Sequence, residues 1–155
     1  MVEKDSFLNK MVASILESEQ PIIYEFHKRA TENGLLFKES KSKKMNYHKI
    51  EYKKDKKDDN LFIISVKGSE WSLHCKLYNL EKYQSKLKNL RKNMYECFMS
   101  SRRCKDSKRL CTVGIKIIIK KEEIMFCRHG IHFKKIIIND IDSLWVLIME
   151  ESKLR

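Results

Sequence analysis

The sequence predicts an α+β domain of two layers, in which a mostly antiparallel sheet carries helices on one face. Two groups of segments have apolar residues at alternate positions, which is typical of half-buried strands. Between and around these groups, other segments repeat apolar residues every three or four positions, as amphipathic helices do. The links between strands are short and polar, which favours hairpins over long crossovers. The predicted order is helix, helix, three strands, helix, three strands, helix.

The chain of 155 residues is expected to form a single domain, 1–155, because this length is sufficient for one hydrophobic core. Residues 1–34 are predicted to be a pair of helices. Pro21 is suited to begin the second helix, and Asn33–Gly34 would end it. The rest of the fold is assigned to an α+β core over residues 47–151.

The first three predicted strands cover His48–Tyr52, Leu61–Val66 and Trp71–Leu77. Before them, a strand could start at Leu35–Phe37, and the polar residues 38–46 are expected to form a loop. A turn containing Gly68 joins the second and third strands into a hairpin. Alternation along the third strand directs Cys75 into the core and His74, with Ser72 and Lys76, to the opposite face.

One long amphipathic helix is predicted to follow, with Asn79 as its cap. Its apolar stripe consists of Leu80, Tyr83, Leu87, Leu90, Met94 and Phe98. The second group of strands is predicted over Val113–Ile119, Ile124–Cys127 and Ile131–Ile138, the last of which could be broken at Lys134–Lys135. Asn139 is expected to cap the last helix, whose buried stripe includes Leu144 and Trp145.

Positive charge is concentrated in the middle of the chain. The formal net charge is +12, and between Lys82 and Lys121 there are thirteen Lys or Arg residues against two acidic ones. Clustered cations favour a polyanion such as nucleic acid, because their binding releases counterions from phosphates. The alternative is that they only keep the protein dissolved. The predicted binding residues are Lys82, Lys86, Lys88, Lys92, Arg102, Arg103, Lys105, Lys108 and Arg109.

The five cysteines, an odd number, fit a reducing compartment better than a disulfide framework. The chain also has no signal-peptide pattern and no apolar run of about 20 residues, so a cytoplasmic protein without membrane contact is expected. Three cysteines, Cys104, Cys111 and Cys127, are candidate zinc ligands, because a hairpin would return the third to the loop that holds the other two. Cys97, His129 or His132 would supply a fourth ligand. Ordinary free thiols, or a redox pair of Cys104 with Cys111, are the alternatives.

The cysteine loop also carries a resemblance to a family. A helix ending in Cys-Phe-Met-Ser-Ser-Arg-Arg-Cys, then a cysteine loop, a hairpin with a terminal cysteine and a final helix are similar to small cysteine-loop proteins of low-GC Gram-positive bacteria. Their loop reads C-x-x-C-x-x-x-C, so the matching positions are Cys104, Ser107, Cys111 and Cys127. The resemblance implies a metal-binding or ligand-sensing domain without an established activity. Ser107 replaces one thiolate and is a poor zinc ligand, which favours the remnant of a metal site.

Catalytic motifs are missing from the sequence. It contains no glycine-rich phosphate loop, no nucleophile elbow, no HExxH pair and no spaced acidic cluster for Mg²⁺. We therefore expect a non-enzymatic cytoplasmic binding protein whose basic surface over residues 82–121 engages a polyanion, first of all nucleic acid. An acidic protein surface is the other expected partner. In that case the chain would be a small inhibitor or adaptor, including one encoded by a mobile element that acts on a nucleic-acid-handling host complex. No cofactor is expected apart from the zinc ion.

Overall fold

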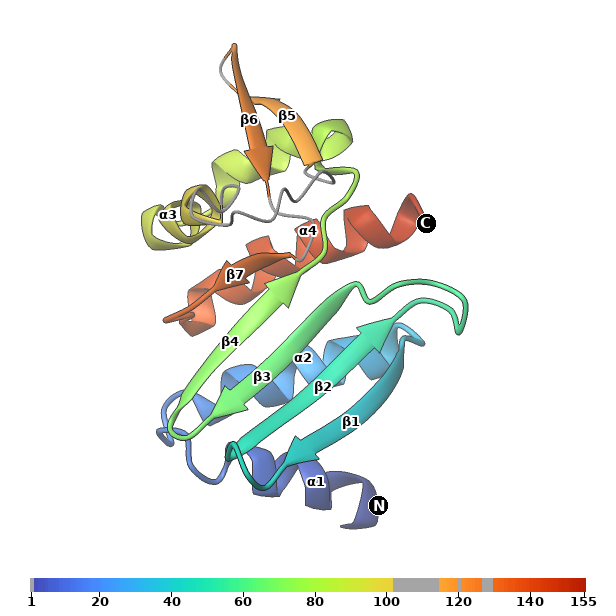
Figure 1. Cartoon of the computed structure of the whole chain (residues 1–155), viewed down its shortest axis with the longest axis vertical. Coiled ribbons are helices and arrows are strands. Elements are labelled where there is room, and N and C mark those ends of the chain that lie inside the picture. The colour runs from blue at the N-terminus through green and yellow to red at the C-terminus, as the bar shows by residue number, and fades with distance from the viewer. Residues whose placement is uncertain (1, 102–114, 120, 127–129) are drawn as a thin grey trace.

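The fold is built on a five-stranded antiparallel sheet with the strand order β1-β2-β3-β4-β7 (Figure 1). Its strands are β1 (Leu36–Ser42), β2 (Tyr47–Lys53), β3 (Phe62–Lys67), β4 (Glu70–Cys75) and β7 (Ile131–Phe133). The structure is a computed structural model that describes residues 2–101, 115–119, 121–126 and 130–155. The predicted α+β class with an antiparallel sheet is confirmed.

Three helices lie behind the sheet in Figure 1, namely α1 (Val2–Val12), α2 (Gln20–Glu32) and α4 (Ile141–Lys153). The ring of Phe62 on β3 joins two of them to the sheet. Its centroid lies 6.4 Å from that of Phe26 on α2 and 6.0 Å from that of Trp145 on α4. These contacts between the sheet and the helices bury apolar surface, and that burial is the main stabilising contribution to the core.

The two faces of the sheet differ in chemistry. On the face toward the helices, Ile64, Leu73 and Cys75 are fully buried, and burial raises the pKa of the Cys75 thiol. On the other face, Ser72 and His74 are only partly buried. This arrangement confirms the prediction for Cys75 and His74, because successive side chains of a strand point to opposite faces.

The edge strand β1 corrects the expectation of a loop over residues 38–46. Seven residues of β1 pair in register with β2, from Leu36 opposite Lys53 to Ser42 opposite Tyr47. Polar residues are acceptable in this position because an edge strand has little to bury, and lysines on an edge discourage unwanted pairing. The first group therefore contains four strands instead of three.

The long helix predicted after Asn79 is divided into two in the structure. A 3₁₀-helix, η1 (Leu80–Asn89), is followed by the α-helix α3 (Lys92–Ser100). The backbone of Arg91 between them is extended, with φ −61° and ψ 151°, and Asn79 makes no side-chain cap bond to η1. The apolar stripe is nevertheless buried along both helices, which is why the spacing suggested one continuous element.

The remaining elements are a small separate hairpin and the entry to α4. Strands β5 (Ile115–Ile119) and β6 (Glu122–Phe126) pair with each other, and Phe126 packs on Phe98 of α3 with 4.4 Å between ring centroids. The predicted strand over Ile131–Ile138 ends at Phe133, and a short 3₁₀-helix, η2 (Ile138–Asp140), replaces the expected Asn139 cap. None of the described helices has the length and apolar composition that crossing a bilayer requires.

Candidate functional site

The predicted basic surface is represented in the structure by four exposed lysines, Lys82, Lys86, Lys88 and Lys92, which we call the lysine row. Three lie on η1 and the fourth begins α3. The opposite side of η1 is buried through Leu80, Tyr83 and Leu87. Arg102, Arg103, Lys105, Lys108 and Arg109, which complete the predicted surface, lie outside the described residues.

The lysine row is free of intramolecular charge partners within the described residues. Five other lysines pair with carboxylates, namely Lys28, Lys49, Lys76, Lys116 and Lys153. No member of the lysine row pairs with a carboxylate of the described ranges, although Glu81 and Glu96 lie on the same two helices. Its ammonium groups are therefore available to an external anion without the loss of an internal ion pair.

A buried carboxylate holds the beginning of η1. Glu151, near the end of α4, is 0% exposed and accepts hydrogen bonds from the backbone N–H of Asn79 at 2.7 Å and from its Nδ2 at 2.9 Å. The hydroxyl of Tyr83 donates to the same carboxylate at 2.7 Å, and Arg155 Nε donates at 3.1 Å. Burial, followed by the charge of Glu151, raises the pKa of Tyr83, so this hydroxyl stays a donor.

A second buried carboxylate holds the end of η1. Asp140, at the start of α4, accepts two parallel hydrogen bonds from Arg91, Nε to Oδ1 and Nη2 to Oδ2, both 2.9 Å long. The backbone N–H of Ile137 also donates to Oδ2 at 2.9 Å. The bond to Asp140 raises the pKa of Arg91. Since Glu151 lies on α4 and Asp140 directly precedes that helix, η1 is fixed to α4 and its entry at both ends, and the lysine row is fixed with it.

A groove of about 420 Å³ lies between η1 and α4. Lys86, Asn89, Leu90 and Arg91 line it on one side, and Asn139, Asp142, Ser143 and Val146 line it on the other. Amide, hydroxyl and cationic side chains donate hydrogen bonds to phosphate oxygens in nucleic-acid complexes. The groove therefore adds neutral donors next to Lys86, whereas the carboxylate of Asp142 opposes an anion there.

No family model, curated protein or solved structure matches this chain. Chemistry must therefore be inferred from the side chains alone.

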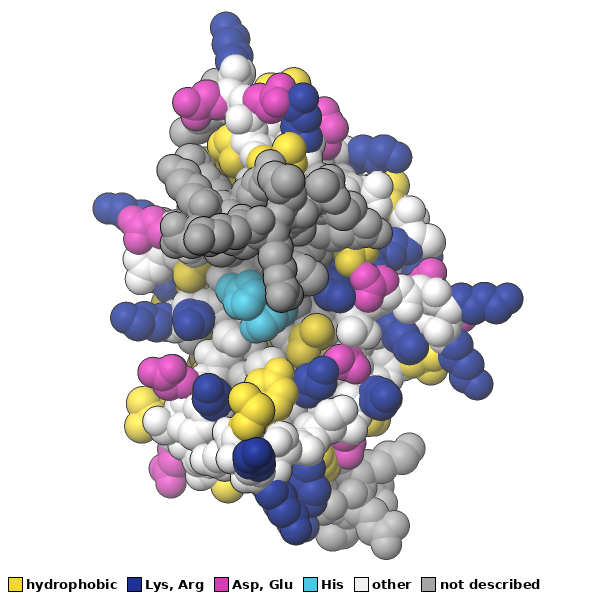
Figure 2. Space-filling view, viewed as in Figure 1, with side chains coloured by type: hydrophobic (Ala, Val, Ile, Leu, Met, Phe, Trp, Pro, Cys, Tyr) yellow, Lys and Arg dark blue, Asp and Glu magenta, His cyan; other side chains and the backbone are white. Residues whose placement is uncertain are grey.

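A histidine pair marks the open face of the sheet. His74 on β4 and His132 on β7 are cross-strand partners, and their ring centroids are 3.7 Å apart. Figure 2 shows histidine side chains in cyan over these strands, with dark blue Lys and Arg side chains around them. Ser72 Oγ lies 3.1 Å from His74 Nε2. Sequence reasoning placed His74 on this face but missed the pair, because only the register of β4 against β7 reveals it.

Both imidazoles are held in the neutral form at pH 7. Burial, with the nearby charges of His132, Lys134 and Lys76, lowers the pKa of His74 to about 4. Burial and Lys134 also lower the pKa of His132. The open face is thus electropositive around the pair even though the histidines carry no charge.

A hollow of about 540 Å³ lies beside the histidine pair, at the part of β4 that does not pair with β7. Tyr47, Ser65, His74 and Lys134 line its polar side. Trp71 also lines it and is only 7% exposed. Within the described residues, its indole Nε1 is the buried side-chain nitrogen or oxygen without a hydrogen-bond partner. Such a donor is costly to leave unpaired, so an acceptor that reached it on binding would gain a hydrogen bond.

The three predicted zinc ligands, Cys104, Cys111 and Cys127, lie outside the described residues, and so do Ser107 and His129. Of the suggested fourth ligands, Cys97 is partly buried on α3 with its Sγ 3.7 Å from the carbonyl oxygen of Lys134, and His132 belongs to the histidine pair. The described ranges contain no group of three or more His, Cys, Asp or Glu residues placed to hold a metal ion. The zinc site stays a prediction from the sequence.

Proposed function

We propose that the protein is a non-enzymatic binding protein whose lysine row engages a polyanion, with nucleic acid as the partner. The observation that carries this proposal is the state of the four lysines. Each is exposed and without an ion pair in the described ranges, and the helix that bears three of them is fixed at both ends by buried carboxylates.

Rigid presentation of the lysines favours binding for two reasons. Each lysine that replaces a counterion on a phosphate contributes through the release of that ion to solution. In addition, η1 is already ordered, so a partner does not have to order the helix when it binds. The donors of the groove beside Lys86 would fix the position of the nucleic acid's phosphate backbone without reading the base sequence, because phosphate contacts carry little information about the bases.

Two charge-matched variants test the proposal. In the first, Lys82, Lys86, Lys88 and Lys92 are all replaced by glutamine. In the control, the same change is made at four other exposed lysines, Lys43, Lys44, Lys56 and Lys57. Both variants lose four positive charges from the net +12. Binding of a fluorescent 20-base-pair duplex is measured by anisotropy at several salt concentrations.

We expect wild-type affinity to fall steeply with salt. The slope of log K against log salt should become shallower by roughly three to four in the row variant, since each phosphate contact contributes about 0.9 for duplex DNA. The control should keep most of the wild-type slope. Equal losses in the two variants would mean that net charge, and not the lysine row, attracts the duplex. Negligible binding by the wild type at low salt would reject nucleic acid as the partner.

A second candidate function, that of a small inhibitor or adaptor, is favoured by a different observation. Three large aliphatic side chains, Leu16, Ile137 and Ile138, are exposed at one concavity far from the lysine row in sequence. Exposed aliphatic clusters are typical of protein interfaces. An adaptor could use this concavity and the basic surface for different partners.

A further inference from the structure

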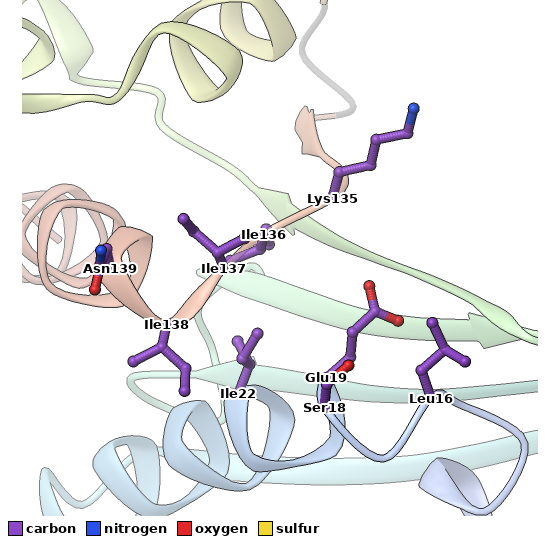
Figure 3. A pocket seen from close by; sticks show the side chains of 9 residues that line it. All are labelled: Leu16, Ser18, Glu19, Ile22, Lys135, Ile136, Ile137, Ile138 and Asn139. Atoms are coloured by element: carbon purple, nitrogen blue, oxygen red, sulfur yellow. The ribbon is translucent and has the colours of Figure 1, made fainter.

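An apolar concavity lies between the α1–α2 turn and the segment that leads from β7 into η2. Figure 3 shows Leu16 and Ile22 on one side of it and Ile136, Ile137 and Ile138 on the other. We call this concavity the aliphatic groove; its volume is about 500 Å³. Leu16 is 67% exposed, Ile137 44% and Ile138 61%. Leaving three aliphatic side chains in water at one place has a cost that a partner would remove.

The aliphatic groove continues into the hollow beside Trp71. Glu19 and Lys135 line both concavities, so the two adjoin, and together we call them the crevice. The crevice begins where β7 leaves β4. Lys135 has a positive φ of 54°, only two residues after the end of β7, and the chain turns there.

The departure of β7 leaves part of β4 with a free edge. Strand β7 pairs with Leu73, His74 and Cys75, whereas Glu70–Ser72 pair with β3 alone within the described residues. A free strand edge presents backbone donors and acceptors that can pair with an added strand. The unpaired indole N–H of Trp71 lies at the same place.

We infer that this crevice is the docking site for an extended segment of an acidic partner protein. The segment adds to the free edge of β4 at Glu70–Ser72, accepts a hydrogen bond from Trp71 Nε1, and inserts an aliphatic side chain into the aliphatic groove. Strand addition supplies affinity through the backbone, and the groove supplies selectivity for the side chain.

Charge decides between an acidic partner and a second copy of this chain. The net charge of +12 opposes contact between two copies. Three lysines, Lys67, Lys134 and Lys135, line the crevice and exceed the two acids there, Glu19 and Glu70. An acidic segment is therefore attracted both by the whole molecule and by the crevice. No member of the lysine row lines the crevice, although Asn139 lines both the aliphatic groove and the groove beside Lys86.

The test uses a displayed library of random 12-residue peptides selected on the full-length wild-type protein, and the enriched peptides are then measured on Ile138→Asp, which plays no part in the selection. Ile138 is mostly exposed, so this change should leave the fold intact, which circular dichroism checks. The expected selection alternates aliphatic and acidic residues. Its peptides should bind Ile138→Asp about tenfold or more weakly than wild type, because one aliphatic contact is lost. They should bind the four-lysine row variant and its charge-matched control equally well, because each variant loses four positive charges that lie outside the crevice.

Trp71→Phe provides a second readout. It keeps an aromatic ring but removes the N–H together with part of the indole, so peptide affinity should fall several-fold, and urea unfolding measures separately the stability lost with the smaller side chain. In a Trp145→Phe background, the single remaining indole N–H resonance, that of Trp71, should shift when peptide is added. Failure to enrich any peptide, or selected peptides that bind Ile138→Asp as tightly as wild type, would overturn the proposal. A dimer in sedimentation that Ile138→Asp dissociates would assign the crevice to a second copy instead.

Discussion

Replacing Glu151 by glutamine tests whether the lysine row depends on its buried anchor. The carboxylate is fully buried, and each of its oxygens accepts two hydrogen bonds. Glutamine has nearly the same shape, but one oxygen becomes an NH₂ group that donates. If the amide oxygen keeps the bonds to Asn79 N and Tyr83, the NH₂ group faces Asn79 Nδ2 and Arg155 Nε, which are both donors.

The magnitude follows from the donors that lose their acceptor. Each buried unpaired donor costs about 1–3 kcal/mol, and the cost is greater for a charged group such as Arg155. Breaking a buried charged pair from one side costs about 3–5 kcal/mol in proteins. We therefore expect Glu151→Gln to lower the free energy of unfolding by about 3–5 kcal/mol, a large part of the stability of an ordinary domain.

The neighbouring Glu150 is a matched control. Its side chain is 29% exposed and pairs at 3.4 Å with Lys153, which is itself 68% exposed. Glu150→Gln should cost no more than about 0.5 kcal/mol, because surface pairs of this kind contribute little. Both variants are unfolded in urea at pH 7 and followed by circular dichroism. A difference below about 1 kcal/mol between them would refute the anchoring role of Glu151.

Three further predictions follow from the same contacts. Asp140→Asn should lower the free energy of unfolding by about 2–4 kcal/mol, because it disturbs the paired hydrogen bonds to Arg91. The control is Asp142→Asn, whose side chain is 86% exposed and whose replacement should cost less than about 1 kcal/mol in the same urea titration. If η1 orients the lysine row, Asp140→Asn should also weaken duplex binding at pH 7 by more than Asp142→Asn does; equal affinities would show that the row does not need this anchor. His74 has a pKa of about 4 in the folded protein, against an ordinary 6.5. Between these pH values the unfolded chain binds a proton at His74 that the folded chain does not bind. The contribution of His74 to stability should therefore be complete above pH 6.5 and should fall as the pH is lowered toward 4. A shift of this size corresponds to about 3 kcal/mol, which screening by solvent reduces to about 1–2 kcal/mol. Urea titrations at pH 7 and pH 4.5 measure how much unfolding free energy each protein loses between the two pH values. Wild type should lose about 1–2 kcal/mol more than His74→Gln, and equal losses would contradict the assignment.

The sequence predicted those parts of the fold that depend on local periodicity. Alternation identified β2, β3 and β4 and the face of each side chain, so Cys75 and His74 were placed correctly. It found only the start of β1, at Leu35–Phe37, because the polar residues of an edge strand need not alternate when pairing with β2 decides their conformation. The break at Arg91 was also missed, since its cause is a carboxylate 49 residues further along the chain.

The same distinction applies to the candidate site. The spacing of apolar residues in η1 showed that the lysine row would be exposed, because its members fall between the buried positions. The anchors of η1, the histidine pair and the crevice each depend on contacts between distant segments. No local pattern encodes those contacts, so they could be found only in three dimensions.

The two anchors on α4 constrain the length of that helix. Asp140 and Glu151 are eleven residues apart, which is about three turns, so both carboxylates emerge on the side that meets η1. Inserting one residue between them would rotate one carboxylate by about 100° and detach one end of η1. An insertion or deletion between Asp140 and Glu151 is therefore expected to be tolerated poorly, which makes Asp-x₁₀-Glu a constrained interval of this fold. Together with Asn79, Tyr83 and Arg91, that interval is a spacing rule by which distant relatives could be recognised.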